Sequence, residues 1–379
     1  MRTFDHSFEP PSASPAGATV QLSAREIEDA GVYEVLQTPG AALGSWAILD
    51  ALLDPNSSEF IFREPLGHSR EVKTALSGLF GRFVARAYLT RYLGFTHFAH
   101  ITKPPMRLRG ISRGRVVRRP GHNGDLPDWV IWNVNTTQIA VAEAKGCHDA
   151  GGPEKALARA WTQVQRVMIE VNRKTVSLKR YAIATRWSAS NSRKPVLSVH
   201  DPEEKGNATP QEHGELGIGI ARLHFASLLR PLGHFDLADA LTAAVRATSQ
   251  REEQENIRRA NTALAQARDR RRVGSKAGTV SVPDHLIGGF VTRGGPIDRA
   301  LEISLDDQKL FRRLGFRPVF VGIERDVLSA AIEGNTDNLT VFDVDAVGLD
   351  TEVPSDGRAR RSRAGTWLIR LDEDEVDIA

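Results

Sequence analysis

Cysteine is nearly absent from this chain, and so are the segments that would direct it to a membrane. Cys147 is the single cysteine among 379 residues, which excludes an intramolecular disulfide and a zinc site built from cysteines. No apolar run is long enough for a transmembrane helix. Residues 1–17 lack the basic and apolar regions of a secretory signal. Together these absences favour a cytoplasmic protein without a membrane partner.

Several motifs that would assign a function directly are also missing. The chain contains no G-x-x-x-x-G-K-[ST] phosphate loop, no G-x-G-x-x-G dinucleotide motif and no H-E-x-x-H zinc motif. No fixed period indicates internal repeats. An enzyme on an unrelated α/β fold would therefore lack a recognisable motif of its own.

The length and composition are those of a soluble globular protein. At 379 residues, 41% hydrophobic and 26% charged, the chain is long for one domain and sufficient for two. Its texture changes along the sequence, and we expect four segments. These are a flexible N-terminal arm over 1–22, a first domain over 23–250, a charged connecting helix over 251–277 and a smaller C-terminal α+β domain over 278–379.

The most informative stretch is a pair of apolar runs at Pro127–Trp132 and Ile139–Gly146. Both are rich in β-branched and aromatic residues, and polar turn formers separate them, which predicts a β-hairpin. Their apolarity is nearly continuous, so we expect both faces of the hairpin to be covered.

Charged residues lie at one end of this hairpin. Asp128 opens the first strand, and Glu143 and Lys145 close the second on the same face. Charges in an apolar setting need a partner or a cation. Two interpretations follow from the residues alone: a metal site, or a structural cluster in which Lys145 pairs with Glu143 or Asp128.

Pro127-Asp128 followed by Glu143-Ala144-Lys145 resembles the signature of the PD-(D/E)xK nucleases, also called restriction-endonuclease-like. The resemblance covers residues 69–187 and not the whole chain. It implies an α/β fold with a mixed sheet flanked by helices. The smaller C-terminal α+β domain lies outside it and is left without a role.

The resemblance also implies a chemistry. Asp128, Glu143 and the Ala144 carbonyl would hold Mg²⁺, for which Mn²⁺ can substitute, and Lys145 would stabilise the attacking water and the transition state. The expected activity is endonucleolytic hydrolysis of phosphodiester bonds, in DNA rather than RNA, with restriction or anti-phage defence as its setting. A homodimer or a partner protein of a defence system fits that setting. The alternative is a catalytically silent nucleic-acid-binding or scaffold protein on the same fold.

Helices are predicted on either side of the hairpin, over 69–92 and 154–172, because each carries an apolar stripe. The resemblance implies that a glutamine of the second helix approaches the active site within a Q-x-x-x-Y pattern. Gln163 fits this pattern in part, since Val167 stands where tyrosine is expected. A glutamine at the edge of an amphipathic helix is the alternative.

A basic block precedes the hairpin. Residues 103–119 contain seven lysines and arginines and no carboxylate, a pattern that suits a nucleic-acid backbone. A solvated basic loop explains it equally well. The candidate phosphate-binding residues are Arg113, Arg115, Arg118 and Arg119.

Further elements follow from local patterns. Ser23 and Glu26 form a capping box that begins a helix. The remaining expectations are helices over 41–53, 216–229, 235–247 and 327–332, strands over 95–101, 180–186, 280–282, 300–303, 318–323 and 366–370, and an irregular excursion over 188–214.

Overall fold

The structure is a computed structural model. It describes residues 1–38, 53, 57–62, 70–148, 152–188, 194–204, 206–272, 285–292, 295–296, 319–339 and 359–370. The chain divides into two compact units, the first made of Met1–Gly40 and Ser45–Ile220 and the second of Ala41–Gly44 and Ala221–Ala379. The division falls inside helix α5 (Pro210–Leu229) and not near residue 250 or 278, where the sequence predicted it.

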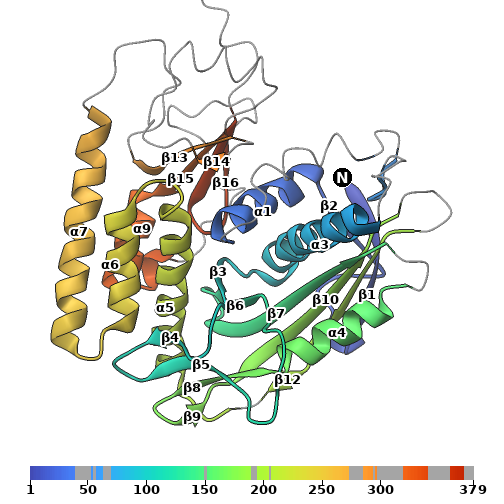
Figure 1. The fold of residues 1–379 in the computed structure, drawn as a ribbon, viewed down its shortest axis with the longest axis horizontal. Coiled ribbons are helices and arrows are strands. Elements are labelled where there is room, and N and C mark those ends of the chain that lie inside the picture. The colour runs from blue at the N-terminus through green and yellow to red at the C-terminus, as the bar shows by residue number, and fades with distance from the viewer. Residues whose placement is uncertain are drawn as a thin grey trace, which may run out of the picture. The chain divides into compact units, whose positions relative to one another are not determined.

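A mixed sheet forms the centre of the first unit (Figure 1). Its strands follow the order β2-β1-β11-β10-β7-β6-β3, and β12 pairs separately with β10. Two of these pairings, β1 with β11 and β7 with β10, are parallel, and the others are antiparallel. The strands are β1 (Arg2–Glu9), β2 (Thr19–Leu22), β3 (His97–His100), β6 (Trp129–Asn133), β7 (Gln138–Cys147), β10 (Leu178–Arg186), β11 (Val196–His200) and β12 (Glu203–Glu204). The predicted mixed sheet is therefore confirmed.

Helices cover both faces of this sheet. They are α1 (Ala24–Gln37), α3 (Arg70–Leu93) and α4 (Glu154–Val164). On β7, Gly146 meets α3 so closely that a Cβ on Gly81 would lie 2.5 Å from the Gly146 nitrogen. The next residue, Cys147, packs against Ala156 of α4. Since neighbouring strand residues point to opposite faces, α3 and α4 lie on opposite sides of β7, as Figure 1 shows.

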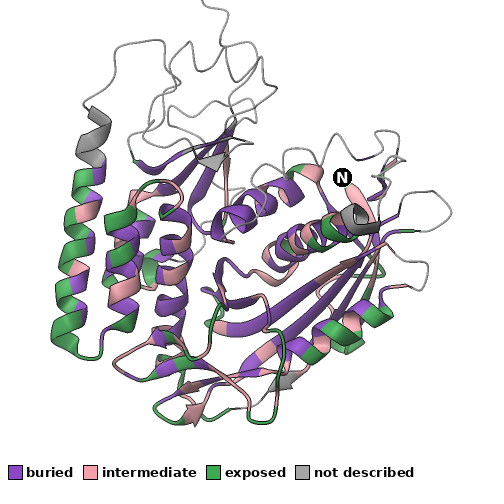
Figure 2. Cartoon of the chain, viewed as in Figure 1, coloured by how far each residue is buried: buried purple, intermediate pink, exposed green. Residues whose placement is uncertain are grey.

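The predicted hairpin is present as β6 and β7. Every residue of β6 is buried, and Figure 2 shows burial along the central strands. The turn is fixed by Asn133, whose Oδ1 accepts the N–H groups of Asn135 at 3.0 Å and Thr136 at 3.3 Å. Because the hairpin is buried and Asn133 holds its turn, the position of its open end is fixed.

The beginning of α1 also matches the prediction. Ser23 Oγ accepts the Glu26 N–H at 3.0 Å, and the Glu26 carboxylate accepts the Ser23 N–H at 2.6 Å. These bonds satisfy two backbone donors that a helix N-terminus leaves without partners. Residues 27–37 are then buried throughout, apart from Asp29, which is partly exposed.

The flexible arm predicted over residues 1–22 is wrong. β1 and β2 occupy this region and form one side of the main sheet. Phe4 and Phe8 alternate into the core, as do Val20 and Leu22, which is the period of a half-buried strand. The prolines that suggested disorder lie in the connection between the two strands.

Two other predictions were wrong in their extent. The helix expected over 154–172 ends at Val164, and β8 (Val167–Val171) follows it. Every second residue, Val167, Ile169 and Val171, is buried. The segment therefore follows the two-residue repeat of a strand and not the repeat of a helix. The irregular excursion expected over 188–214 contains β11, β12 and the beginning of α5.

The basic block forms a β-hairpin and not a loop. Its strands are β4 (Met106–Arg109) and β5 (Gly114–Arg118), which continue through β8 into β9 (Lys174–Thr175) as a four-stranded sheet in the order β4-β5-β8-β9. Leu108, Val116 and Ile169 are buried beneath this sheet. The basic side chains thus project from a folded platform.

The second unit combines helices with a five-stranded antiparallel sheet. The sheet order is β14-β13-β15-β17-β16. The elements beyond α5 are α6 (Phe235–Arg246), α7 (Gln250–Arg272), β13 (Leu286–Thr292), β14 (Gly295–Pro296), β15 (Val319–Glu324), α9 (Arg325–Glu333), β16 (Ala359–Arg361) and β17 (Thr366–Arg370). The elements predicted at 216–229, 235–247, 318–323, 327–332 and 366–370 correspond to α5, α6, β15, α9 and β17.

The connecting helix predicted over 251–277 belongs to this unit. Its helix, α7, buries Ala260, Leu264 and Ala267. The buried Arg222 of α5 donates to Glu253 of α7 at 2.7 Å and to the Ile332 carbonyl of α9 at 2.8 Å. These bonds explain why the boundary precedes α6 and α7.

Within the part of the chain that is described, no helix combines the length and the apolarity needed to cross a membrane.

The helix predicted over 41–53 and the strands predicted over 280–282 and 300–303 lie outside the described residues, except for residue 53.

Candidate metal-dependent active site

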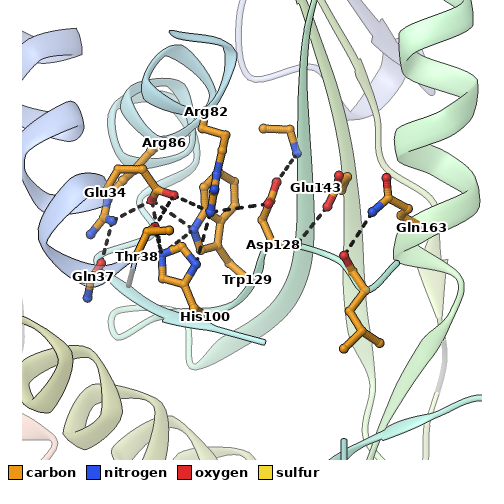
Figure 3. A network of polar contacts seen from close by, with 12 residues as sticks. Glu34, Gln37, Thr38, Arg82, Arg86, His100, Asp128, Trp129, Glu143 and Gln163 are labelled. Atoms are coloured by element: carbon orange, nitrogen blue, oxygen red, sulfur yellow. Dashed lines mark hydrogen bonds and ion pairs between the residues drawn. The ribbon is translucent and has the colours of Figure 1, made fainter. Parts of the chain in front are cut away.

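The open end of the β6–β7 hairpin brings two carboxylates together. The register pairs Trp129 with Ala142, so Asp128 lies opposite Glu143. Each carboxylate accepts a backbone N–H from the other strand: Asp128 N donates to Glu143 Oε2 at 2.8 Å, and Ala144 N donates to Asp128 Oδ2 at 2.9 Å (Figure 3). These reciprocal bonds fix both side chains at the same place.

Lys145 adds an ammonium group to this end of the hairpin. It forms an ion pair with Glu143 Oε1, and its side chain is 32% exposed while that of Glu143 is 1% exposed. The carboxylate is therefore buried and its cation lies at the solvent boundary. The structural alternative predicts the same ion pair.

The environment of Glu143 disfavours its charged form. Burial and the neighbouring Asp128 carboxylate raise the pKa of Glu143 to about 8, although Lys145 and the Asp128 N–H act in the opposite direction. Two carboxylates that repel each other in a medium of low dielectric gain stability from a cation between them. A cation bound between them would therefore favour the charged form of Glu143.

The donor set fits Mg²⁺. The N–H and C=O groups of one strand residue point toward the same neighbouring strand. Because the Ala144 N–H points toward Asp128, the Ala144 carbonyl points toward Asp128 as well. Ala144 lies just past Ala142, the last residue of β7 that pairs with β6 at this end. Among the described residues, no group of three or more His, Cys, Asp or Glu side chains gathers as a closed metal site. Two carboxylates and a carbonyl suit Mg²⁺, which commonly keeps several waters and takes further oxygens from a phosphate.

Gln163 supports the site from α4, which lies on the face of β7 to which Glu143 and Lys145 point. It lies in the last turn of α4, is buried, and donates from Nε2 to the Leu126 carbonyl at 3.1 Å (Figure 3). Leu126 precedes the Pro127-Asp128 pair, so Gln163 holds the backbone that delivers Asp128.

A charged network that the sequence did not reveal adjoins Asp128. Arg82 Nη2 of α3 lies 2.6 Å from Glu34 Oε1 of α1 and 3.5 Å from Asp128 Oδ1. Arg86 Nη1 and Trp129 Nε1 donate to Glu34 Oε2 at 3.2 Å and 3.1 Å. The network thus connects a buried carboxylate in α1 with the candidate metal site.

Glu34 remains ionised although its side chain is only 1% exposed. Burial alone would raise the pKa of Glu34, but His100, Arg82 and Arg86 outweigh burial and hold it well below its usual range. Glu34 and Arg86 are charged residues within helical stretches that are otherwise largely apolar, and this pattern is the signal that could have identified them. Their partnership is not readable from the sequence because 51 intervening residues separate them.

The four arginines of the basic block divide into two pairs. Arg113 and Arg115 are exposed on the β4–β5 hairpin, where Arg115 pairs with Glu170 at 3.2 Å. Arg118 and Arg119 are partly exposed, and Arg118 donates to the Gly124 carbonyl at 2.9 Å. The first pair is available to a polyanion, while Arg118 stabilises the loop that leads to Asp128.

No protein-family model, no curated protein and no solved structure matches the chain.

Proposed function

We propose that the protein is a Mg²⁺-dependent nuclease that hydrolyses phosphodiester bonds, with DNA as the expected substrate. The observation that carries the proposal is the reciprocal hydrogen bonding of Asp128 and Glu143 at the open end of a buried hairpin, with Lys145 on the same carboxylate cluster. The PD-(D/E)xK resemblance agrees with this geometry. Restriction or anti-phage defence is the setting that we propose for the activity.

Each residue has a defined task in this proposal. Asp128, Glu143 and the Ala144 carbonyl would hold the metal, for which Mn²⁺ can substitute. The bound cation would lower the pKa of a water and neutralise charge on the scissile phosphate. Lys145 provides a compact positive charge where negative charge develops as water attacks phosphorus and the bond to the leaving oxygen breaks. Gln163 keeps the Asp128 backbone in place.

The β4–β5 hairpin would contact the nucleic-acid backbone. Arg107 and Arg115 are directly opposite each other on β4 and β5, and both are exposed. Like charges directly opposite across strands are destabilising, and an anionic partner would relieve this repulsion. Contacts of this kind add affinity without reading sequence.

The test is cleavage of plasmid and single-stranded oligonucleotides by the purified full chain, with Mg²⁺ and with a chelator. We expect cleavage with Mg²⁺ and its loss in Lys145→Ala. Absence of cleavage on every DNA and RNA substrate, with a folded protein that binds no divalent cation, would contradict the proposal.

A catalytically silent nucleic-acid-binding or scaffold protein is the second candidate. It is favoured by one observation: Lys145 pairs with Glu143, and Arg82 lies 3.5 Å from Asp128, so both carboxylates have a cation without any metal. Salt-dependent binding of nucleic acid with no cleavage and no metal binding would support this alternative.

A further inference from the structure

Arg82 lies between two carboxylates of very different exposure. Its Nη2 atom contacts Glu34 Oε1 at 2.6 Å and Asp128 Oδ1 at 3.5 Å, and the Arg82 side chain is 23% exposed. The short contact is to the buried carboxylate, and the long one is to a residue of the candidate metal site (Figure 3). The guanidinium is therefore anchored on one side and only loosely engaged on the other.

Several other groups also hold the Glu34 carboxylate in place. Glu34 also accepts hydrogen bonds from Arg86 at 3.2 Å, Trp129 Nε1 at 3.1 Å and Thr38 at 3.3 Å. Arg86 is buried and donates to Gln37 as well, at 2.6 Å. Because several donors from different elements hold Glu34, its charge and position do not depend on Arg82 alone.

The backbone brings Arg82 to this place. A Cβ on the preceding residue, Gly81, would lie 2.5 Å from the Gly146 nitrogen, and a Cβ on Gly146 would lie 1.6 Å from the Ser77 carbonyl oxygen. Helix α3 thus touches β7 directly after Lys145. The pKa of Arg82 is raised because Glu34, Asp128 and Glu143 together outweigh its burial, so its positive charge is permanent.

We propose that Arg82 is a positioning residue and counter-cation that sets the metal affinity of the Asp128–Glu143 site, and that Glu34 limits how strongly the guanidinium engages Asp128. This inference rests on the proposed metal-dependent function. Without metal, Arg82 neutralises Asp128. A divalent cation at the carboxylates is repelled by the nearby guanidinium, so Arg82 keeps metal binding weak and reversible.

The two residues should therefore act in opposite directions. Arg82→Gln removes the competing charge and should tighten Mn²⁺ binding by about tenfold or more. Glu34→Gln frees Arg82 to engage Asp128 fully and removes a nearby negative charge, so it should weaken Mn²⁺ binding by a similar factor. The effect of Glu34→Gln should shrink in the Arg82→Gln background, since it acts largely through Arg82.

The experiment is calorimetric titration of the full chain with Mn²⁺, together with thermal unfolding with and without Mn²⁺. Arg91→Gln is the matched control, because Arg91 lies on the same helix in an exposed pair with Glu26. Its metal affinity should equal that of the wild type. A tighter Arg82→Gln and a weaker Glu34→Gln, each with a matching change in the metal-induced rise of Tm, would support the proposal.

Other outcomes overturn it in distinguishable ways. If the wild type binds Mn²⁺ and a folded Arg82→Gln binds it equally or more weakly, Arg82 merely supports the fold and the proposed function survives. If Arg82→Gln does not fold, Glu34→Gln decides: equal or tighter binding overturns the inference. A folded wild type that binds no Mn²⁺ overturns both this inference and the proposed function.

Discussion

Glu34 and Glu143 are equally buried carboxylates whose surroundings have opposite effects. Each side chain is 1% exposed. Glu34 is surrounded by His100, Arg82 and Arg86, which hold its pKa well below the usual range. Glu143 has Lys145 on one oxygen but Asp128 beside it, and its pKa rises to about 8.

Under the proposed function, this difference separates a structural charge from a catalytic one. Desolvation disfavours the ionised form in both places, and the partners decide the outcome. The Glu34 cluster is satisfied within the protein, so it contributes to the fold. In the Glu143 cluster, burial and Asp128 outweigh Lys145, and strongly perturbed carboxylates of this kind are concentrated at functional sites.

The largest effect should come from breaking the Glu143 cluster. Lys145→Ala should lower cleavage about 10³-fold while Tm stays near that of the wild type, because Lys145 acts when charge develops on the phosphate. Asp128→Ala and Glu143→Ala should abolish cleavage and metal binding together, and double variants should lose little more than single ones. The measurement is the initial rate of plasmid cleavage beside the unfolding curve. Cleavage that persists in all three variants while stability falls would make the trio a structural ion cluster.

Breaking the Glu34 cluster should instead affect folding. Glu34→Ala leaves the buried Arg86 without its counter-charge and should lower the free energy of unfolding by about 3–5 kcal/mol. Glu170→Ala removes an exposed pair with Arg115 and should change it by less than about 1 kcal/mol. Denaturant titration measures both. Equal losses in the two variants would contradict the structural role of Glu34.

The contact between α3 and β7, which links the two clusters, can be tested with a glycine pair. Gly81→Ala places a Cβ 2.5 Å from the Gly146 nitrogen and should destabilise the protein by about 1–3 kcal/mol. Gly78, one turn earlier on the same helix, has nothing within 4 Å of such a Cβ, so Gly78→Ala should stabilise by about 0.5–1 kcal/mol. Changes of the same sign in both variants would indicate that the helix does not pack this closely.

The pH dependence of stability should identify Glu143. Its pKa rises from 4.5 to about 8 on folding, so the folded state holds more protons between these values, and stability falls as pH rises through that window. Glu143→Gln should be more stable than the metal-free wild type at pH 8 by at least about 1 kcal/mol, and the advantage should vanish near pH 4.5. Unfolding curves across pH give the comparison, and parallel curves for the two proteins would refute it.

The smallest expected effect concerns the basic hairpin. The double charge reversal of Arg113 and Arg115 to glutamate should weaken binding to all DNA sequences and reduce the salt slope by about 1 for each phosphate that is no longer neutralised. Reversal of the exposed Arg251 and Arg258 on α7 is the control and should leave the slope unchanged. Fluorescence anisotropy over a range of salt concentrations measures it. An unchanged slope in the first variant would mean that Arg113 and Arg115 contact solvent and not DNA.

The sequence was sufficient where local pattern determines structure. The β6–β7 hairpin was predictable because two apolar runs flank a polar turn, and strand alternation then brought Glu143 and Lys145 to one face. Gln163 was singled out by the partial Q-x-x-x-Y resemblance, although the position at which its helix ends was not predicted. Beyond Val164, buried residues alternate, and strand and helical periods compete in so short a segment.

The sequence was insufficient where distant segments meet. Phe4 and Phe8 carry the alternation of a strand, but the prolines after them suggested disorder, and their pairing with β11 is non-local. In the same way Glu34, Arg82 and Asp128 come from three separate elements. Their proximity depends on how α1 and α3 pack, and no spacing in the chain encodes it.

The parallel pairing of β1 with β11 has a consequence for folding during synthesis. Asp5 pairs with Val196 and Glu9 with His200, so the first strand made must wait for one made much later. At about 5–20 residues per second, the delay is about 10–40 s. During this interval the edge of β1 that β11 later covers lacks its partner and is open to pairing with other chains. Recruitment of a chaperone to the nascent chain would be most valuable before residue 200 emerges from the ribosome.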